Sequence, residues 1–114
     1  MTKNSDKLKI GKIMAYLIYA IDFENQEEIR ESLREAHRQH LRSVGRKLIG
    51  SGALLDDDGK NILGGISLLD TDDKDEAVRF AEQDPYAKAG IRQETKIIRW
   101  RRRWLDGEFL GKEI

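Results

Sequence analysis

The sequence contains no cysteine. Without thiols the chain cannot form disulfides, a thiolate zinc site or a cysteine nucleophile. Disulfide-free chains are typical of the reducing cytoplasm, which is the location that we expect. The sequence also lacks an excess of one charge, because 21 basic residues balance 21 acidic residues. No overall electrostatic field therefore attracts nucleic acid or an anionic membrane, and we expect neither as a partner.

Long hydrophobic runs are missing as well. The longest apolar stretch, residues 13–21, is far shorter than the roughly 20 residues that a membrane-spanning helix needs. The polar start of the chain has no hydrophobic region of the signal-peptide kind. At 114 residues, with 39% hydrophobic and 37% charged residues, the composition indicates one globular domain around one core.

The chain divides into three parts. Residues 1–11 are polar and show no periodicity, so we expect a loosely attached leader. The domain is predicted to span residues 12–104. Residues 105–114 form a C-terminal tail with two glycines and several large apolar side chains, which can pack on the body of the domain or on a partner subunit.

Hydrophobic periodicity predicts four strands and two helices. The first strand is apolar on both of its faces, which is typical of a central strand covered on both sides. The first helix is amphipathic and is expected to end at Gly45. An Asp-Asp-Asp-Gly turn predicts a hairpin between the next two strands, and the glycines of these strands indicate bulges or a close backbone approach. The second helix has several candidate caps, among them Asp73 with Glu76 as a capping-box-like pair. The predicted elements are a strand at 13–21, a helix at 24–44, strands at 48–55 and 62–69, a helix between 71 and 84, and a strand at 95–104.

This order is the split βαβ arrangement of an α+β, ferredoxin-like fold, written βαββαβ. Such a fold has a four-stranded antiparallel sheet that carries both helices on one face. The two-faced apolar pattern of residues 13–21 would leave the second face of the sheet exposed in a monomer. We therefore expect a homodimer in which a second copy covers that sheet face.

Both histidines lie on the first predicted helix. His37 continues the i, i+4 row of Ile29 and Leu33, a place where leucine would be ordinary. His40 also lies near the apolar stripe, so periodicity does not choose between the two histidines. For either one the alternative is simple packing, with the ring nitrogens hydrogen-bonded to backbone or water.

Asp84 is unusual because a carboxylate at the end of a helix faces the negative pole of the helix dipole. A cation or a hydrogen-bond donor nearby would compensate it. Alternatively, Asp84 caps a following turn that begins with Pro85. Hydroxyl groups that can line a pocket, or equally belong to the core or to turns, are those of Tyr16, Tyr19, Ser51, Ser67 and Tyr86.

Other signals have simpler explanations. The alternation of arginine and tryptophan at 99–104 resembles a nucleic-acid patch, but it is more typical of a charged strand at a sheet edge or of a subunit contact. His37 and His40 lack a third ligand at metal-binding spacing, so we expect no metal. No glycine-rich phosphate loop occurs, and we expect no cofactor.

Several segments, read in order, resemble the YCII (YciI-like) family. They are Arg34-Glu35-Ala36-His37 with Leu41, Gly45-Arg46-Lys47-Leu48, Gly52, and Asp84-Pro85-Tyr86-Ala87-Lys88-Ala89-Gly90. The resemblance covers about residues 13–104 and implies a dimeric α+β barrel. It also implies an active site built on a His-Asp pair, which in this chain is His37 and Asp84. The chain departs from the family at Gly52-Ala53, where the family has glycine-proline.

A His-Asp pair permits proton transfer near neutral pH, because the carboxylate fixes the imidazole tautomer and raises its basicity. We therefore predict a cofactor-free lyase or isomerase that acts on an unidentified small molecule, in a pocket between the first helix and the sheet. Arg34 is expected to bind an anionic oxygen of the substrate. The alternative is a non-catalytic dimeric module that binds a metabolite or has a regulatory role.

Overall fold

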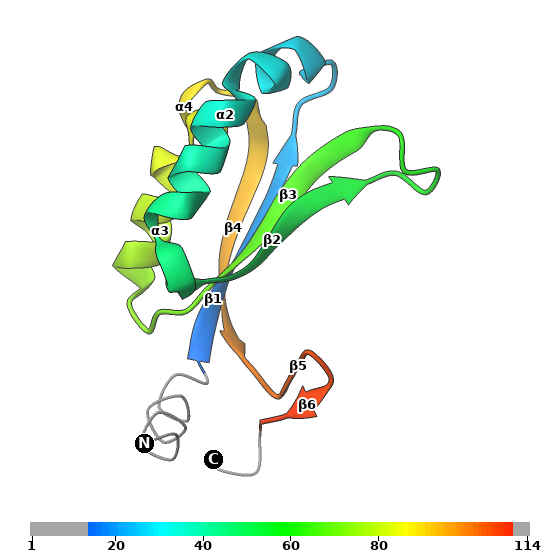
Figure 1. The fold of residues 1–114 in the computed structure, drawn as a ribbon. Coiled ribbons are helices and arrows are strands. Elements are labelled where there is room, and N and C mark those ends of the chain that lie inside the picture. The colour runs from blue at the N-terminus through cyan, green and yellow to red at the C-terminus, as the bar shows by residue number, and fades with distance from the viewer. Residues whose placement is uncertain (1–13, 111–114) are drawn as a thin grey trace.

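The computed structural model describes residues 14–110, and its elements follow the predicted order (Figure 1). The predicted leader, residues 1–11, and the last residues of the tail, 111–114, lie outside the described residues. The elements are β1 (Met14–Asp22), α2 (Glu27–Ser43), the 3-10 turn η1 (Gly45–Lys47), β2 (Leu48–Leu55), β3 (Ile62–Leu69), α3 (Lys74–Gln83), α4 (Pro85–Lys88), β4 (Arg92–Arg101), β5 (Trp104–Leu105) and β6 (Glu108–Phe109).

The main sheet has four strands in the order β2-β3-β1-β4, and every neighbouring pair is antiparallel. Helices α2 and α3 lie on the same side of this sheet (Figure 1). This is the predicted α+β, ferredoxin-like architecture, which the structure confirms. β1 is central, as its two apolar faces predicted.

Helix boundaries follow local chemistry. Gly45 has a positive φ of 57°, a left-handed conformation that glycine adopts without strain, and α2 ends just before it. Asp73 caps α3 by accepting a hydrogen bond from the amide of Asp75. The expected pairing of Asp73 with Glu76 does not form. The carboxylate of Glu76 instead accepts hydrogen bonds from the hydroxyl of Thr71 and from Lys47.

The last strand of the main sheet is displaced from its predicted position. β4 begins at Arg92 rather than at residue 95 and ends at Arg101, because it pairs with β1 as far as Asp22. Trp104 belongs instead to the short β5–β6 hairpin. β4 is an edge strand, and Arg99 contacts the hydroxyl of Tyr16, as expected for a charged strand at a sheet edge.

The core lies between α3 and the sheet. Ala77 and Phe80 of α3 pack against Tyr16, Ile18 and Leu69 of the two central strands. In contrast, α2 contributes no fully buried residue. The apolar stripe of α2 packs on this core near the C-terminal end of the helix, through the partly buried Leu41, whereas Ile29 near the N-terminal end is 40% exposed.

Gly64 marks a close approach between β3 and β1. A Cβ atom at this position would overlap the backbone carbonyl of Ala20. The glycine-rich hairpin predicted a close backbone approach, and this is where it occurs.

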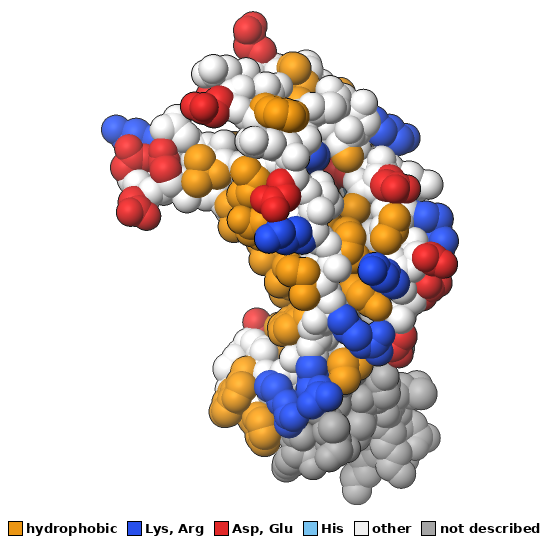
Figure 2. All heavy atoms as spheres, turned by 180° about the vertical axis from the view of Figure 1, so that it is seen from behind, with side chains coloured by type: hydrophobic (Ala, Val, Ile, Leu, Met, Phe, Trp, Pro, Cys, Tyr) orange, Lys and Arg blue, Asp and Glu red, His pale blue; other side chains and the backbone are white. Residues whose placement is uncertain are grey.

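The sheet face opposite the helices carries apolar side chains. Leu17 and Tyr19 of β1 and Leu68 of β3 are half-buried there, and Ile98 of β4 is 48% exposed. Seen from behind, hydrophobic side chains gather along the hollowed middle of the molecule (Figure 2). Within residues 14–110, no helix is long and apolar enough to cross a membrane.

Candidate active site

A cavity of about 220 Å³ lies between the helices and the sheet. The strand register explains the hollow, because the side chains of successive cross-strand rows become smaller along the sheet. The first row is built from large side chains, the second contains the paired serines, and the third consists of glycine and alanine. These rows are Tyr16-Leu69-Leu48, then Ile18-Ser67-Ser51, then Ala20-Gly65-Ala53. Members of the second and third rows line the cavity.

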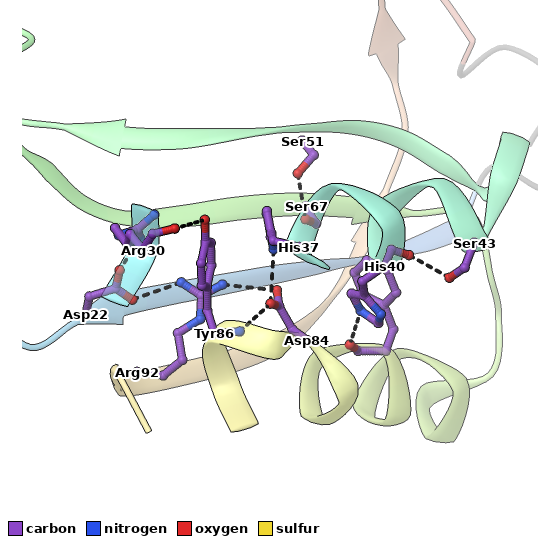
Figure 3. A network of polar contacts seen from close by, with 11 residues as sticks. Asp22, Arg30, His37, His40, Ser43, Ser51, Ser67, Asp84, Tyr86 and Arg92 are labelled. Carbon is purple, nitrogen blue, oxygen red and sulfur yellow. Dashed lines mark hydrogen bonds and ion pairs between the residues drawn. The ribbon is translucent and has the colours of Figure 1, made fainter. Parts of the chain in front are cut away.

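His37 lines this cavity from α2 and contacts Asp84. The His37 Nδ1 and Asp84 Oδ1 atoms are 3.0 Å apart, and the two side chains are 21% and 10% exposed (Figure 3). An ionised carboxylate only accepts hydrogen bonds, so Nδ1 carries the proton. Nε2 has no hydrogen-bond partner among residues 14–110 and is available as an acceptor.

Asp84 has two structural roles at once. It caps α4, because its Oδ1 accepts a hydrogen bond of 2.9 Å from the amide of Tyr86, with Pro85 at the first position of that helix. Its other oxygen lies 3.2 Å from the guanidinium of Arg92. The cap and the partner of His37 were alternatives in the sequence, and the structure combines them in one carboxylate.

These contacts keep Asp84 ionised. Burial alone would raise the pKa of this carboxyl group, but the hydrogen bond and the charge of His37 oppose it. The amide of Tyr86 and the positive charge of Arg92 act in the same direction as His37, and the pKa of Asp84 is lowered from its ordinary value.

We expect this lowered pKa to appear as a pH-dependent contribution to stability. The stabilisation from ionised Asp84 is complete above the pKa of an unfolded aspartate, about 3.9, and is lost as the pH falls through the lower folded-state pKa. The difference in unfolding free energy between the native chain and Asp84→Asn should therefore shrink as the pH falls below about 4. Urea denaturation at several pH values measures this difference. Asp56 also has a lowered pKa, of about 2, but its contribution is the same in both proteins and drops out of the difference. A difference that does not change with pH would contradict this account.

Tyr86 packs between the charged groups of the site. Its ring stacks on the His37 imidazole, with centroids 4.3 Å apart and planes inclined by 20°. The guanidinium carbons of Arg30 and Arg92 lie 4.9 and 5.4 Å from the ring centroid. The Tyr86 hydroxyl donates a hydrogen bond of 3.3 Å to the carbonyl of Arg30. Tyr86 therefore contacts both His37 and Arg30.

Asp22 connects the two arginines. Its side chain is only 2% exposed, and it accepts hydrogen bonds from Arg30 and, at 2.9 Å, from Arg92 (Figure 3). Arg92 thus bridges Asp22 and Asp84, and a continuous chain of polar contacts runs from Arg30 to His37. Our sequence reasoning missed Asp22, Arg30 and Arg92 as members of the site. The sequence signal that was available is the position of Asp22, a carboxylate directly after the apolar run 13–21.

His40 has a different environment. Its Nε2 lies 2.8 Å from the carbonyl oxygen of Phe80, and its ring stacks on the Phe80 ring with centroids 4.6 Å apart. His40 does not line the cavity described above. His40 is therefore a packed histidine with its ring nitrogen bound to the backbone, which was the simpler alternative for either histidine, whereas His37 contacts a carboxylate.

Arg34 lies away from the cavity. Its half-exposed side chain pairs with Glu31 on the surface of α2, and it is absent from the residues that line the cavity within the described chain. Arg30, one turn earlier on the same helix, does line the cavity. Across residues 14–110, no group of three or more histidine, cysteine or acidic side chains is arranged to hold a metal ion.

The geometry defines a class of protein, a small ferredoxin-like α+β domain with a His-Asp contact at a cavity beneath its first helix. The profile of the YCII-related domain matches residues 14–101, and the chain belongs to this family. No curated protein matches the chain.

Solved structures similar to this chain include the following two. The first is 5-chloro-2-hydroxyhydroquinone dehydrochlorinase from Burkholderia phenoliruptrix in complex with 2,5-dihydroxybenzoquinone, with 28% identity and a TM-score of 0.69. This similarity covers 76% of our chain and 93% of the dehydrochlorinase. The second, a protein from Arabidopsis thaliana, is 10% identical over 82% of our chain and 98% of its own, with a TM-score of 0.41, and is too distant to inform the site.

Proposed function

We propose that this protein is a cofactor-free acid-base enzyme of the lyase or isomerase type, acting on a small oxygenated ring compound, and that it works in the cytoplasm. The observation that carries the proposal is the 3.0 Å contact between His37 and Asp84 at the cavity. Asp84 is held as a carboxylate, so the imidazole keeps its proton on Nδ1 and offers Nε2 as a base.

The proposed reaction begins when Nε2 of His37 removes a proton from an O–H or C–H group of the substrate. The electron pair left behind forms a new double bond. In a lyase reaction, a leaving group then departs with its bonding pair, and the net loss is HX. In an isomerase reaction, the proton returns at another atom. Asp84 and the ring of Tyr86 stabilise the imidazolium that forms in either case.

The dehydrochlorinase similarity favours the lyase form of this proposal. That enzyme is named for the loss of hydrogen chloride from a hydroxylated, chlorinated ring, and a ring compound occupies it. Our chain is similar to it over most of both chains. A cavity of about 220 Å³ is suited to one six-membered ring with its substituents.

Binding of an anionic oxygen, the role predicted for Arg34, is better suited to Arg30. Arg30 and Arg92 line the cavity, and their side chains are only 13% and 14% exposed. A shielded guanidinium interacts with an oxyanion more strongly than an exposed one does, because less water screens it. We therefore propose Arg30 as the residue that binds the substrate oxyanion.

The homodimer remains part of the proposal. The apolar sheet face with Leu17, Tyr19, Leu68 and Ile98 supports it, because a monomer would leave this surface in water. We expect light scattering to give the mass of two chains, unchanged on dilution. A stable monomer would rule out pairing through the sheet.

The enzymatic proposal is tested by chloride release. The purified chain is incubated with 5-chloro-2-hydroxyhydroquinone and with related hydroxylated rings that carry a halogen, and chloride is measured over time against buffer alone. Proton exchange into the same rings from deuterated water tests the isomerase form. Neither release nor exchange in any compound, together with specific binding of one of them, would favour the non-catalytic binding module.

A further inference from the structure

Ser51 and Ser67 form a polar pair on the sheet surface of the cavity, which Thr95 and Arg92 of β4 also line. They are cross-strand partners in β2 and β3, and their hydroxyl oxygens are 2.9 Å apart. Both line the cavity, and in the same cross-strand row Ile18 is the neighbour of Ser67 on β1. Alanine at both positions would leave the same hollow without placing hydroxyl groups in it.

The pair cannot satisfy its own hydrogen-bonding groups. Two hydroxyls supply two O–H donors, and their mutual hydrogen bond uses one of them. Among the described residues, neither hydroxyl has another hydrogen-bond partner. One donor and several lone pairs therefore remain available to a molecule in the cavity.

The cavity consequently has two polar regions. One contains His37, Asp84, Arg30 and Arg92, supplied by the helices and β4 (Figure 3). The other is the serine pair, supplied by β2 and β3. Small residues of the third row, Ala53 and Gly65, continue the floor beside the serines.

We infer that Ser51 and Ser67 bind a second oxygen of the substrate, so that the cavity selects single-ring compounds with oxygen atoms at opposite ends. This inference rests on the proposed function for the first oxygen, which the His37 region binds. The serines determine specificity and take no proton in the reaction. A ring with one oxygen lacks the hydrogen bond to the serine pair and binds more weakly.

The experiment compares benzene-1,4-diol with phenol, which have oxygen at both ends and at one end of the ring. Isothermal titration calorimetry measures the Kd of each for the native chain and for the Ser51→Ala, Ser67→Ala double variant. We expect the native chain to bind the diol about 6- to 20-fold more tightly, which combines one ordinary hydrogen bond with the statistical factor of about 2 for a ring with two equivalent ends. In the double variant this ratio should fall to that factor of about 2, with the affinity for phenol unchanged.

Ser32→Ala is the matched control, because Ser32 is an exposed serine of α2 whose hydroxyl bonds to the carbonyl of Ile29. This variant should keep the native ratio. Native-chain binding with no preference for the diol beyond the statistical factor, binding of neither probe, or an unchanged ratio in the double variant would overturn the inference. Single serine variants replace the double variant if it does not fold. A diol preference that depends on the serines, without turnover of any substrate, would keep the inference and reject the proposed chemistry.

Discussion

Asp22→Ala is expected to lower the free energy of unfolding by about 3–5 kcal/mol, the usual effect of removing one partner from a buried ion pair. The Asp22 carboxylate is 2% exposed and accepts hydrogen bonds from both Arg30 and Arg92. Its removal leaves two shielded guanidinium groups close together, and neither can regain full hydration without opening the site. Arg92 keeps its contact with Asp84, but Arg30 loses its only ion-pair partner among residues 14–110.

Urea denaturation of the two proteins at neutral pH measures this effect. Glu94→Ala is the control, because Glu94 is half-exposed and pairs with Lys96 at 3.5 Å on the surface. An exposed pair contributes about 0–1 kcal/mol, so the control should unfold almost as the native chain does. A loss below about 1 kcal/mol for Asp22→Ala would show that the ion-pair chain does not stabilise the fold.

The fold was predictable because its signals are local. The hairpin strands at 48–55 and 62–69 have the predicted bounds, since two short apolar segments surround a turn whose conformation the sequence dictates. In that turn Gly59 has a positive φ of 75°, and Asp56 accepts hydrogen bonds from the amides of Lys60 and Asn61. Each of these features can be recognised within a few residues of sequence.

The site was only partly predictable because its contacts connect distant residues. Periodicity placed both histidines near the apolar stripe. Their partners depend on the tertiary packing of α3 and α4, which brings Asp84 next to His37 and the Phe80 carbonyl next to His40. Arg92 was missed because β4 was predicted to begin at residue 95. The strand begins earlier, and its pairing with β1 brings Arg92 opposite Asp22.

Arg30 and Arg34, on one helix, also show that the sequence alone did not identify which residue reaches the site. Both arginines are surrounded by charged residues in the sequence, and the resemblance to the family drew attention to Arg34. The structure turns Arg30 toward Asp22 and the cavity, while Arg34 pairs with Glu31 at the surface. One turn of helix separates them, and the buried carboxylate at the end of β1 decides which arginine is shielded from water.

His37→Ala is expected to lower kcat by about 10²- to 10⁴-fold on any substrate that the chain turns over, because that is the usual contribution of a general base. Initial rates of chloride release or proton exchange measure the loss. Asp84→Asn should also be strongly impaired, since an amide no longer provides the charge that stabilises the imidazolium. Removing the imidazole leaves space beside Tyr86, so added imidazole should restore part of the rate of His37→Ala and none of the rate of Asp84→Asn.

His40→Ala provides the matched control, because His40 lies one turn from His37 and also stacks on an aromatic ring. Its nitrogen is bound to a backbone carbonyl, and its side chain is outside the residues that line the cavity. This variant should lose stability, since Phe80 is a core residue, but the folded fraction should keep its kcat. If His37→Ala and His40→Ala reduced kcat equally, the effect would come from packing and not from proton transfer. A large loss confined to His37→Ala, with rescue by imidazole, would assign the base, because among these variants only a missing proton acceptor can be replaced from solution.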